Sequence, residues 1–128
     1  MAYDIAFLIG RIIVGLYFIF SGFNHFKDLG VMTGYAKSKG VPAPAFMVVI
    51  TGIMLLLGGL SIGFGVYPYI GVLLLGVFLL ITTFAMHDFW NTPSDQKQSE
   101  KINFLKNWAL IGSLLMFLAI QTPWVLSL

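Results

Sequence analysis

The strongest constraint on the fold is a series of four long apolar runs separated by short turn-forming or charged segments. The runs cover about residues 5–23, 45–66, 68–86 and 104–126. Each is close to the roughly 20 residues that an α-helix needs to cross a bilayer, whereas a membrane strand needs only about 9–11. Because lipid offers no hydrogen bonds to the backbone, helices are favoured throughout. The sequence therefore predicts one all-α domain over residues 1–128, an integral membrane four-helix bundle with up-down topology.

Composition supports a lipid environment. Charged residues make up 9% of the chain, compared with about 25% in soluble domains, so the lipid bilayer is the expected partner. The net charge is +2, but the basic residues lie between apolar runs, where they set membrane orientation, and no nucleic-acid partner is predicted. The chain has no cysteine, which excludes disulfides and thiolate metal sites.

The lysines predict the orientation. One side of the bundle, with the first and third loops and the entry to the fourth run, is expected to carry Lys27, Lys37, Lys39, Lys97, Lys101 and Lys106. The other side holds both termini and a single basic residue, Arg11. Since Lys and Arg favour the cytoplasm, we expect a multi-pass protein of the cell membrane with both termini outside.

Two further segments have two interpretations each. The stretch from Leu29 to Lys39 is too short and polar to span the membrane, and fits either an amphipathic helix along the membrane surface or a plain loop. Gly59 and Gly63 have the spacing of a close helix–helix contact, although glycine is common in membrane helices without such a role.

Arg11 is an ionisable residue inside an apolar run, which makes it a candidate ligand-binding residue. Either it snorkels and pairs with nearby groups, or it holds an anionic or carbonyl ligand. Asp4 lies on the same face of the predicted helix, seven residues earlier. Gln121, Tyr67 and Tyr69 are expected at a similar depth.

A second polar group is predicted at the lysine-bearing side. The up-down topology brings three helix ends to one face, and the candidate ligand-binding residues there are Asn24, His25, His87, Asp88, Trp90, Lys106 and Asn107. Histidine titrates near neutral pH, so the group fits a proton-coupled site. It also fits a site for a quinone-like head group, with hydrogen bonds to the carbonyl oxygens and stacking on Phe89 or Trp90. The alternative is simple interfacial anchoring, because Trp, Asn and Lys are ordinary at helix ends.

Haem, metal and catalytic sites have weaker support in the sequence. Two histidines on different helices could ligate a haem iron, but no haem attachment motif is present, and no metal site is predicted. The sequence contains no phosphate loop, dinucleotide fingerprint or Ser-His-Asp order, so catalysis stays undecided.

A set of short motifs, in order along essentially the whole chain, resembles the DoxX family of small membrane proteins. The motifs are Gly10-Arg11, Ser21 to Lys27, Gly34-Tyr35-Ala36, Lys39 to Pro44, Leu57 to Leu60, His87 to Trp90 and Phe104 to Asn107. The resemblance implies a four-helix protein of the bacterial cytoplasmic membrane. It also implies an association with quinone-linked redox and stress systems, with quinone as the candidate cofactor.

Two functional hypotheses follow from the residues and the resemblance. In the first, the chain is an accessory membrane subunit or quinone-associated component of an oxidoreductase system, with redox partner proteins in the membrane. In the second, it is a non-enzymatic module that binds a lipid, a small hydrophobic molecule or a partner protein, in a transport or assembly role. Either hypothesis allows a homo-oligomer. The fold alone does not decide between the two functions.

Overall fold

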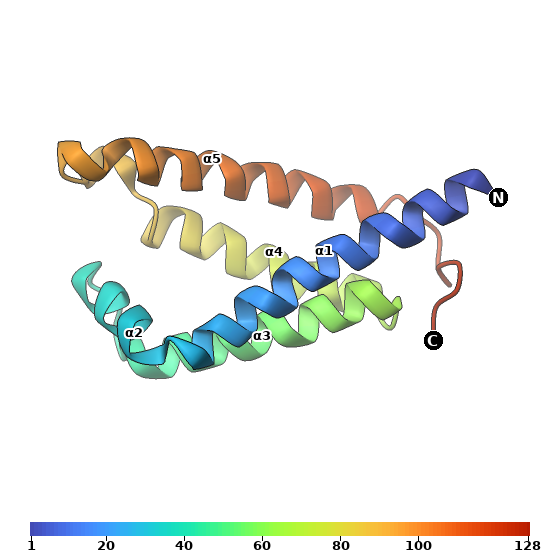
Figure 1. Cartoon of the computed structure of the whole chain (residues 1–128), viewed down its shortest axis with the longest axis horizontal. Helices are drawn as coiled ribbons and strands as arrows, with labels where there is room; N and C mark the ends of the chain where they lie inside the picture. Colours follow the sequence, from blue (N-terminus) through green and yellow to red (C-terminus); the bar gives the residue numbers. More distant parts are fainter.

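The computed structural model describes residues 1–128 and contains helices but no strands (Figure 1). The elements are α1 (Ala2–Lys27), α2 (Leu29–Ser38), α3 (Pro44–Phe64), α4 (Pro68–Ala85), the 3-10 helix η1 (Phe89–Asn91) and α5 (Ser94–Phe117). The long helices α1, α3, α4 and α5 alternate in direction (Figure 1). Both chain termini therefore lie at one end, the terminal end, and α2, η1 and the start of α5 lie at the other, the basic end.

The long helices direct many large apolar side chains outward. On α1, Ile13, Leu16 and Phe20 are 61%, 58% and 69% exposed, and a soluble monomer rarely exposes a continuous apolar surface of this kind. Three segments are long and apolar enough to cross a membrane, namely Ala2–Lys27, Pro44–Phe64 and Pro68–Asn91. The outer surface of the chain is thus suited to contact with lipid.

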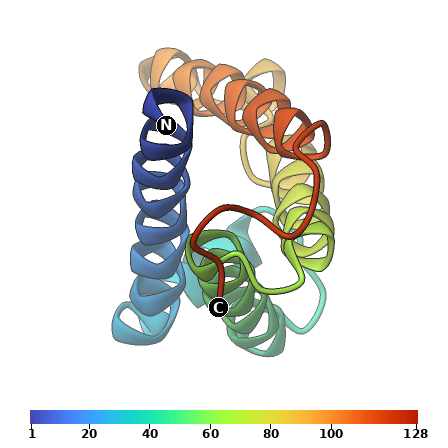
Figure 2. The ribbon, with the colours of Figure 1, turned by 90° about the vertical axis from the view of Figure 1, so that its right-hand side faces the viewer.

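The fourth apolar run departs from the expectation. Residues 104–126 are predicted to be helical, but α5 ends at Phe117, and residues 118–128 cross the terminal end of the bundle as turns (Figure 2). Pro123 lies in this stretch, and proline cannot continue a helix. The first half of α5 carries charged residues, so α5 is not among the three segments apolar enough to span. We call residues 118–128 the C-terminal strap.

Glycines allow α1 and α3 to pack backbone to backbone. A Cβ atom on Gly15 would lie 2.8 Å from the Gly59 carbonyl oxygen and 3.0 Å from the Gly63 Cα. Seven residues further along α1, a Cβ atom on Gly22 would lie 2.9 Å from the Gly52 carbonyl oxygen. Any side chain at these positions would push the helices apart. The predicted close-packing role is confirmed for Gly59, with Gly15 as the partner on α1, whereas a Cβ atom on Gly63 would meet nothing within 4 Å.

The remaining helices complete an apolar core, but the neighbouring helices α1 and α5 are not packed backbone to backbone. Side chains from all four long helices meet in a buried cluster that includes Phe18, Leu55, Leu75 and Leu114. In contrast, no Cα atom of α5 comes within 8 Å of one in α1, and the two helices form separate sides of the ring seen in Figure 2. They approach through side chains at the terminal end, where the Phe7 and Phe117 rings are 6.0 Å apart.

The segment from Leu29 to Lys39, which the sequence predicts to be either a surface helix or a plain loop, forms the helix α2. Its Ala36 is buried, while Val31 on another side is 78% exposed. The α3–α4 connection is the short turn expected between Gly65 and Pro68. Gly65 adopts a φ of 72°, a left-handed conformation that glycine accepts without strain.

Replacing Gly15 by alanine should separate α1 from α3. The new methyl group would meet main-chain atoms, which cannot rotate away, so we expect a loss of about 1–3 kcal/mol, as for other overpacked sites. The measurement is the melting temperature in detergent. Gly10→Ala on the same helix is the control, because a Cβ there meets nothing within 4 Å. Equal melting of the two variants would contradict the packing described.

Candidate functional site

One ion pair and one histidine–carboxylate contact connect the helices at the basic end. The Lys39 Nζ atom, after α2, lies 2.6 Å from an Asp88 carboxylate oxygen, after α4, and both side chains are mostly buried. The His87 Nδ1 atom lies 3.2 Å from a Glu100 carboxylate oxygen on α5. The first pair holds the α2–α3 loop against the end of α4, and the second holds α5 against the same segment.

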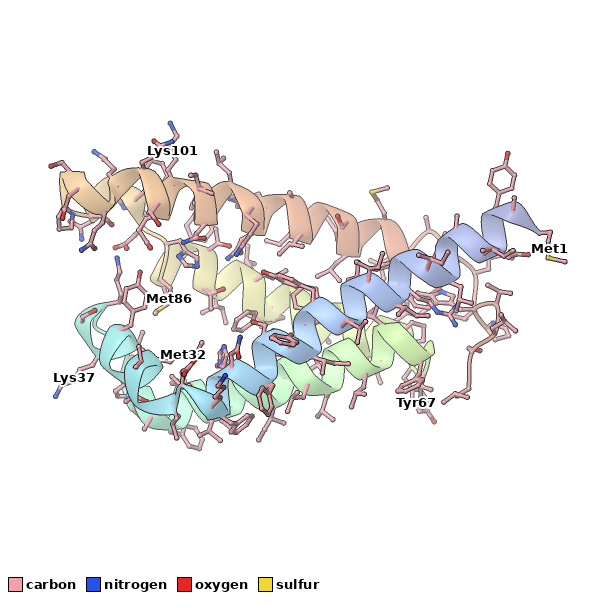
Figure 3. All side chains as sticks on the ribbon, in the orientation of Figure 1. Met1, Met32, Lys37, Tyr67, Met86 and Lys101 are labelled. Carbon is pink, nitrogen blue, oxygen red and sulfur yellow. The ribbon has the colours of Figure 1, made fainter.

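Tyr35 joins these pairs from α2. Its hydroxyl donates a hydrogen bond to the Met86 carbonyl oxygen at 3.1 Å, and the Lys39 ammonium lies 5.7 Å from the centre of its ring. Burial, and then the nearby carboxylate of Glu100, raise the pKa of the Tyr35 phenol well above its ordinary value. The phenol therefore stays a hydrogen-bond donor. We call Tyr35, Lys39, His87, Asp88 and Glu100 the basic-end cluster (Figure 3 labels the neighbouring Met86).

The basic-end cluster can accept one proton. Lys39 and Asp88 neutralise each other, so Glu100 leaves one negative charge when His87 is neutral. Protonation of His87 makes its contact with Glu100 a charged ion pair and brings the cluster to neutrality. Glu100 is only 9% exposed, and its charge is therefore weakly screened by water. Chemically, the cluster can donate one hydrogen bond from Tyr35, when its hydroxyl turns away from the Met86 carbonyl oxygen, and exchange a proton at the His87–Glu100 pair.

His25, another predicted residue, belongs to a separate contact. Its Nδ1 atom lies 3.0 Å from the Val48 carbonyl oxygen and 3.2 Å from the Thr51 hydroxyl, both on α3. Its ring packs edge-on against Phe78, with centroids 5.9 Å apart. No hydrogen bond or ion pair joins His25 to the basic-end cluster, so the two predicted histidines lie at the same end without touching.

The other predicted site residues differ in how far their side chains are exposed. Asn107 is 5% exposed, one heptad along α5 from Glu100, and so lies on the same inward face. Lys106 points outward, and Asn24 is half-buried with no side-chain hydrogen bond. Trp90 is 53% exposed and packs in a group of aromatic rings. The rings of this aromatic group are Phe84, Phe89, Trp90, Phe104 and Trp108.

Arg11 lies at the terminal end and is completely buried. Its Nη2 atom donates to the Leu126 carbonyl oxygen at 2.9 Å, and its Nε atom donates to the Gly63 carbonyl oxygen at 3.4 Å. Asp4, on the same helix, instead lies 3.8 Å from the N-terminal ammonium group. Arg11 thus binds main-chain oxygens, and none of the side chains expected at its depth is a hydrogen-bond or ion-pair partner.

The C-terminal strap covers this arginine. Trp124, which is 2% exposed, has its ring centre 5.7 Å from the Arg11 guanidinium carbon, and the Phe7 ring lies at 5.5 Å. Both distances are typical of cation–π contacts. Sequence reasoning missed Trp124 because residues 118–126 were assigned to a membrane span.

Sequence reasoning also missed Tyr35, Lys39 and Glu100 as members of a site. The structure buries Glu100, Asn107 and Leu114, which recur every seven residues along α5, but the charged residues around Glu100 hide this pattern in the sequence. This is the spacing of one face of a packed helix. No group of three His, Cys, Asp or Glu side chains lies together in a way that could hold a metal ion.

Comparison with known proteins decides the family. Residues 6–88 match the sequence model of the DoxX family. This chain belongs to the DoxX family. It is 30% identical over 128 residues to the inner membrane protein YqjF of Escherichia coli strain K12, covering 98% of this chain and 90% of that protein. No solved structure gives a significant match.

Family membership confirms the resemblance seen in the motifs and places this DoxX chain among membrane proteins. The family match ends at Asp88, so it includes α1, α2, α3 and α4 with the first residues of the basic-end cluster. Together with the three spanning segments, it establishes a helical protein embedded in the bilayer.

Replacing Tyr35 by phenylalanine should change how stability depends on pH. The folded protein raises the pKa of this phenol, so the unfolded chain releases the proton first, starting near the ordinary value of 10.0. Below that pH the stability difference between wild type and Tyr35→Phe should be constant. Above it, the wild type should lose stability relative to the variant. Parallel melting curves from pH 8 to above the ordinary value would contradict the placement of the phenol of Tyr35, a residue that is 37% exposed, beside Glu100.

Proposed function

We propose that this chain binds an amphipathic molecule with a proton-exchanging polar head group, of the quinone class, as an accessory component of a membrane redox system. The observation that carries the proposal is the half-buried His87–Glu100 pair, 3.2 Å apart at one end of an otherwise apolar bundle. A quinone head group gains protons when it is reduced, so a group that stores and returns a proton beside it is chemically useful.

The surroundings of this pair supply the other requirements of a head-group site. Tyr35 offers a neutral hydroxyl, which can donate to a carbonyl oxygen of the ligand in exchange for the Met86 carbonyl oxygen that it now binds. The aromatic group next to the cluster includes Phe89 and Phe104, whose ring centres are 5.2 Å apart, and it offers flat apolar faces for stacking. Binding sites of this type combine mostly apolar walls with a few placed polar groups.

An apolar tail can reach the head-group site from the lipid between α1 and α5. Their backbones are not packed against each other, since no pair of their Cα atoms lies within 8 Å. Entry there would displace side chains without breaking a glycine contact such as the one that joins α1 to α3. The chain would thus contribute a binding and proton-exchange step, and its role in the redox system is accessory.

The proposal includes a topology. We infer that α5 is the fourth membrane span, entering near Phe104 and running antiparallel to α4. The basic end would then face the cytoplasm, with both termini outside, because the lysines gather at that end.

A second candidate function is a non-catalytic lipid-binding or partner-binding module. It is favoured by an apolar groove of about 330 Å³ between α3, α4 and the C-terminal strap, lined by residues that include Leu57, Leu60, Phe64, Ile70 and Leu74. This groove is separate from the basic-end cluster, so the two functions predict different effects of the same substitutions.

Substitutions in the proton-accepting pair should weaken quinone binding while leaving the fold intact. His87→Gln keeps a hydrogen-bonding group and removes the titration, and Glu100→Gln removes the charge with little change in shape. We expect each to lower the affinity for a short-chain benzoquinone about tenfold, the effect of losing one charged hydrogen bond. Titration of purified protein, followed by quenching of tryptophan fluorescence, measures this change.

Lys97→Gln is the control for that titration, because Lys97 is an exposed lysine on the same end of α5. It should bind as the wild type does. If His87→Gln and Glu100→Gln also bind like the wild type, the basic-end cluster only ties the helices together. Co-purification of lipid alone would then favour the second candidate.

Single-cysteine labelling tests the topology, since the chain has no cysteine of its own. A cysteine at the exposed Ser99 should react with a membrane-impermeant reagent only after the cytoplasmic side is opened. A cysteine in place of Tyr3, which is 91% exposed, should react from outside in intact cells. The reverse pattern would overturn the orientation. A third cysteine, in place of Leu128 after α5, which is 86% exposed, should also react from outside, and its reaction from the same side as Ser99 would exclude α5 as a span.

A further inference from the structure

The Arg11 guanidinium is a buried cation without an acidic partner. The residue is 0% exposed, and none of the ion pairs in the structure includes it. Its Nη1 atom is inaccessible and has no hydrogen-bond partner at all. A buried charge that is neither paired nor fully hydrogen-bonded is strongly unfavourable.

The groups around Arg11 compensate its charge only in part. The two oxygens that it binds belong to Gly63 and Leu126, and Gly63 lies in the last turn of α3, where the helix dipole favours a cation. The rings of Phe7 and Trp124 lie over the guanidinium. Hydrogen-bond acceptors approach a guanidinium in its plane, and the Nη1 edge of that plane is left without one.

A pocket lies immediately beside this arginine. It has a volume of about 610 Å³ and runs between the α3–α4 turn and the C-terminal strap. Gly65 lines the pocket, and a Cβ atom built on Gly65 would lie only 3.6 Å from the guanidinium carbon and 2.8 Å from the Ser127 Cβ. Gly65 and Ser127 therefore form the thin wall between Arg11 and the pocket. Tyr67 and Thr122 also line the pocket.

We propose that Arg11 and the C-terminal strap form a binding site for a phosphate-type oxyanion, which enters through this pocket. Two anionic oxygens would accept hydrogen bonds from Nη1 and Nη2, with the strap shifting so that the Leu126 carbonyl gives up its bond. Paired N–H donors in one plane match an oxyanion in this way. The site is at the opposite end from the basic-end cluster and does not depend on the proposed quinone function. The anion is either a phospholipid head group or a soluble phosphate ester.

Trp124 reports directly on this site. The chain has three tryptophans, and Trp90→Phe with Trp108→Phe leaves Trp124 alone. Protein purified in an uncharged maltoside detergent is titrated with inorganic phosphate, with phosphatidylglycerol, and with sodium chloride at matched ionic strength. We expect a saturable change in Trp124 emission. A response to inorganic phosphate assigns a soluble anion, and a response to phosphatidylglycerol alone assigns a lipid head group.

Two variants separate binding from folding. Ser127→Leu adds volume at the wall between Arg11 and the pocket, and Arg11→Lys keeps the charge but loses the paired donors. In that single-tryptophan background, each should raise the half-saturating concentration about tenfold or more, while the Trp124 emission without ligand shows whether the strap is still in place. The proposal is overturned if sodium chloride gives the same response, if no probe gives one, or if both variants bind as the parent does. Arg11 would then be a structural clamp between α3 and the strap.

Discussion

The contact between glycines on α1 and α3 is the interaction on which the rest of the structure depends. In lipid there is little hydrophobic drive for helices to associate, so close backbone approach has to supply the attraction. Gly15 against Gly59, and Gly22 against Gly52, fix α1 along α3 in both position and rotation. The same rotation turns Arg11 toward the end of α3 and His25 toward Val48, because both lie on the glycine-bearing face of α1.

The other helices are held mainly through α4 and through polar contacts at the two ends. α5 packs closely on α4 and η1 but meets α1 only through side chains. Its position relative to α1 therefore depends on the His87–Glu100 pair at the basic end and on the C-terminal strap at the terminal end. The strap in turn depends on Arg11, which binds Leu126. At each end of the bundle, a polar contact that holds two segments together also includes a buried ionisable group. These contacts are the His87–Glu100 pair and the bond from Arg11 to the C-terminal strap, and the two proposed sites lie there.

The sequence predicted the parts that follow from length and polarity. Apolar runs of spanning length fixed the helices α1, α3 and α4, and alternating direction placed His87 and Asp88 at the lysine-bearing end. It could not reveal the partner of His87, because Glu100 lies among exposed charges and only the rotation of α5 turns it inward. The acceptors of Arg11 were hidden for another reason: they are main-chain oxygens, which leave no side-chain pattern. The strap was mistaken for membrane helix because it is as apolar as one.

The central claim is that an amphipathic molecule places its head group at the basic-end cluster. The chain has six methionines, of which Met32 and Met86 lie near the cluster, whereas Met1 is at the terminal end (Figure 3). Met116 is 71% exposed on the last turn of α5 and would report a probe that merely dissolves in the lipid. The decisive measurement is NMR of ¹³C-methyl methionine in lipid nanodiscs, titrated with a short-chain benzoquinone. We expect saturable shifts of the Met32 and Met86 signals with Met1 and Met116 unchanged, and equal or larger shifts at Met1 and Met116 would contradict the claim.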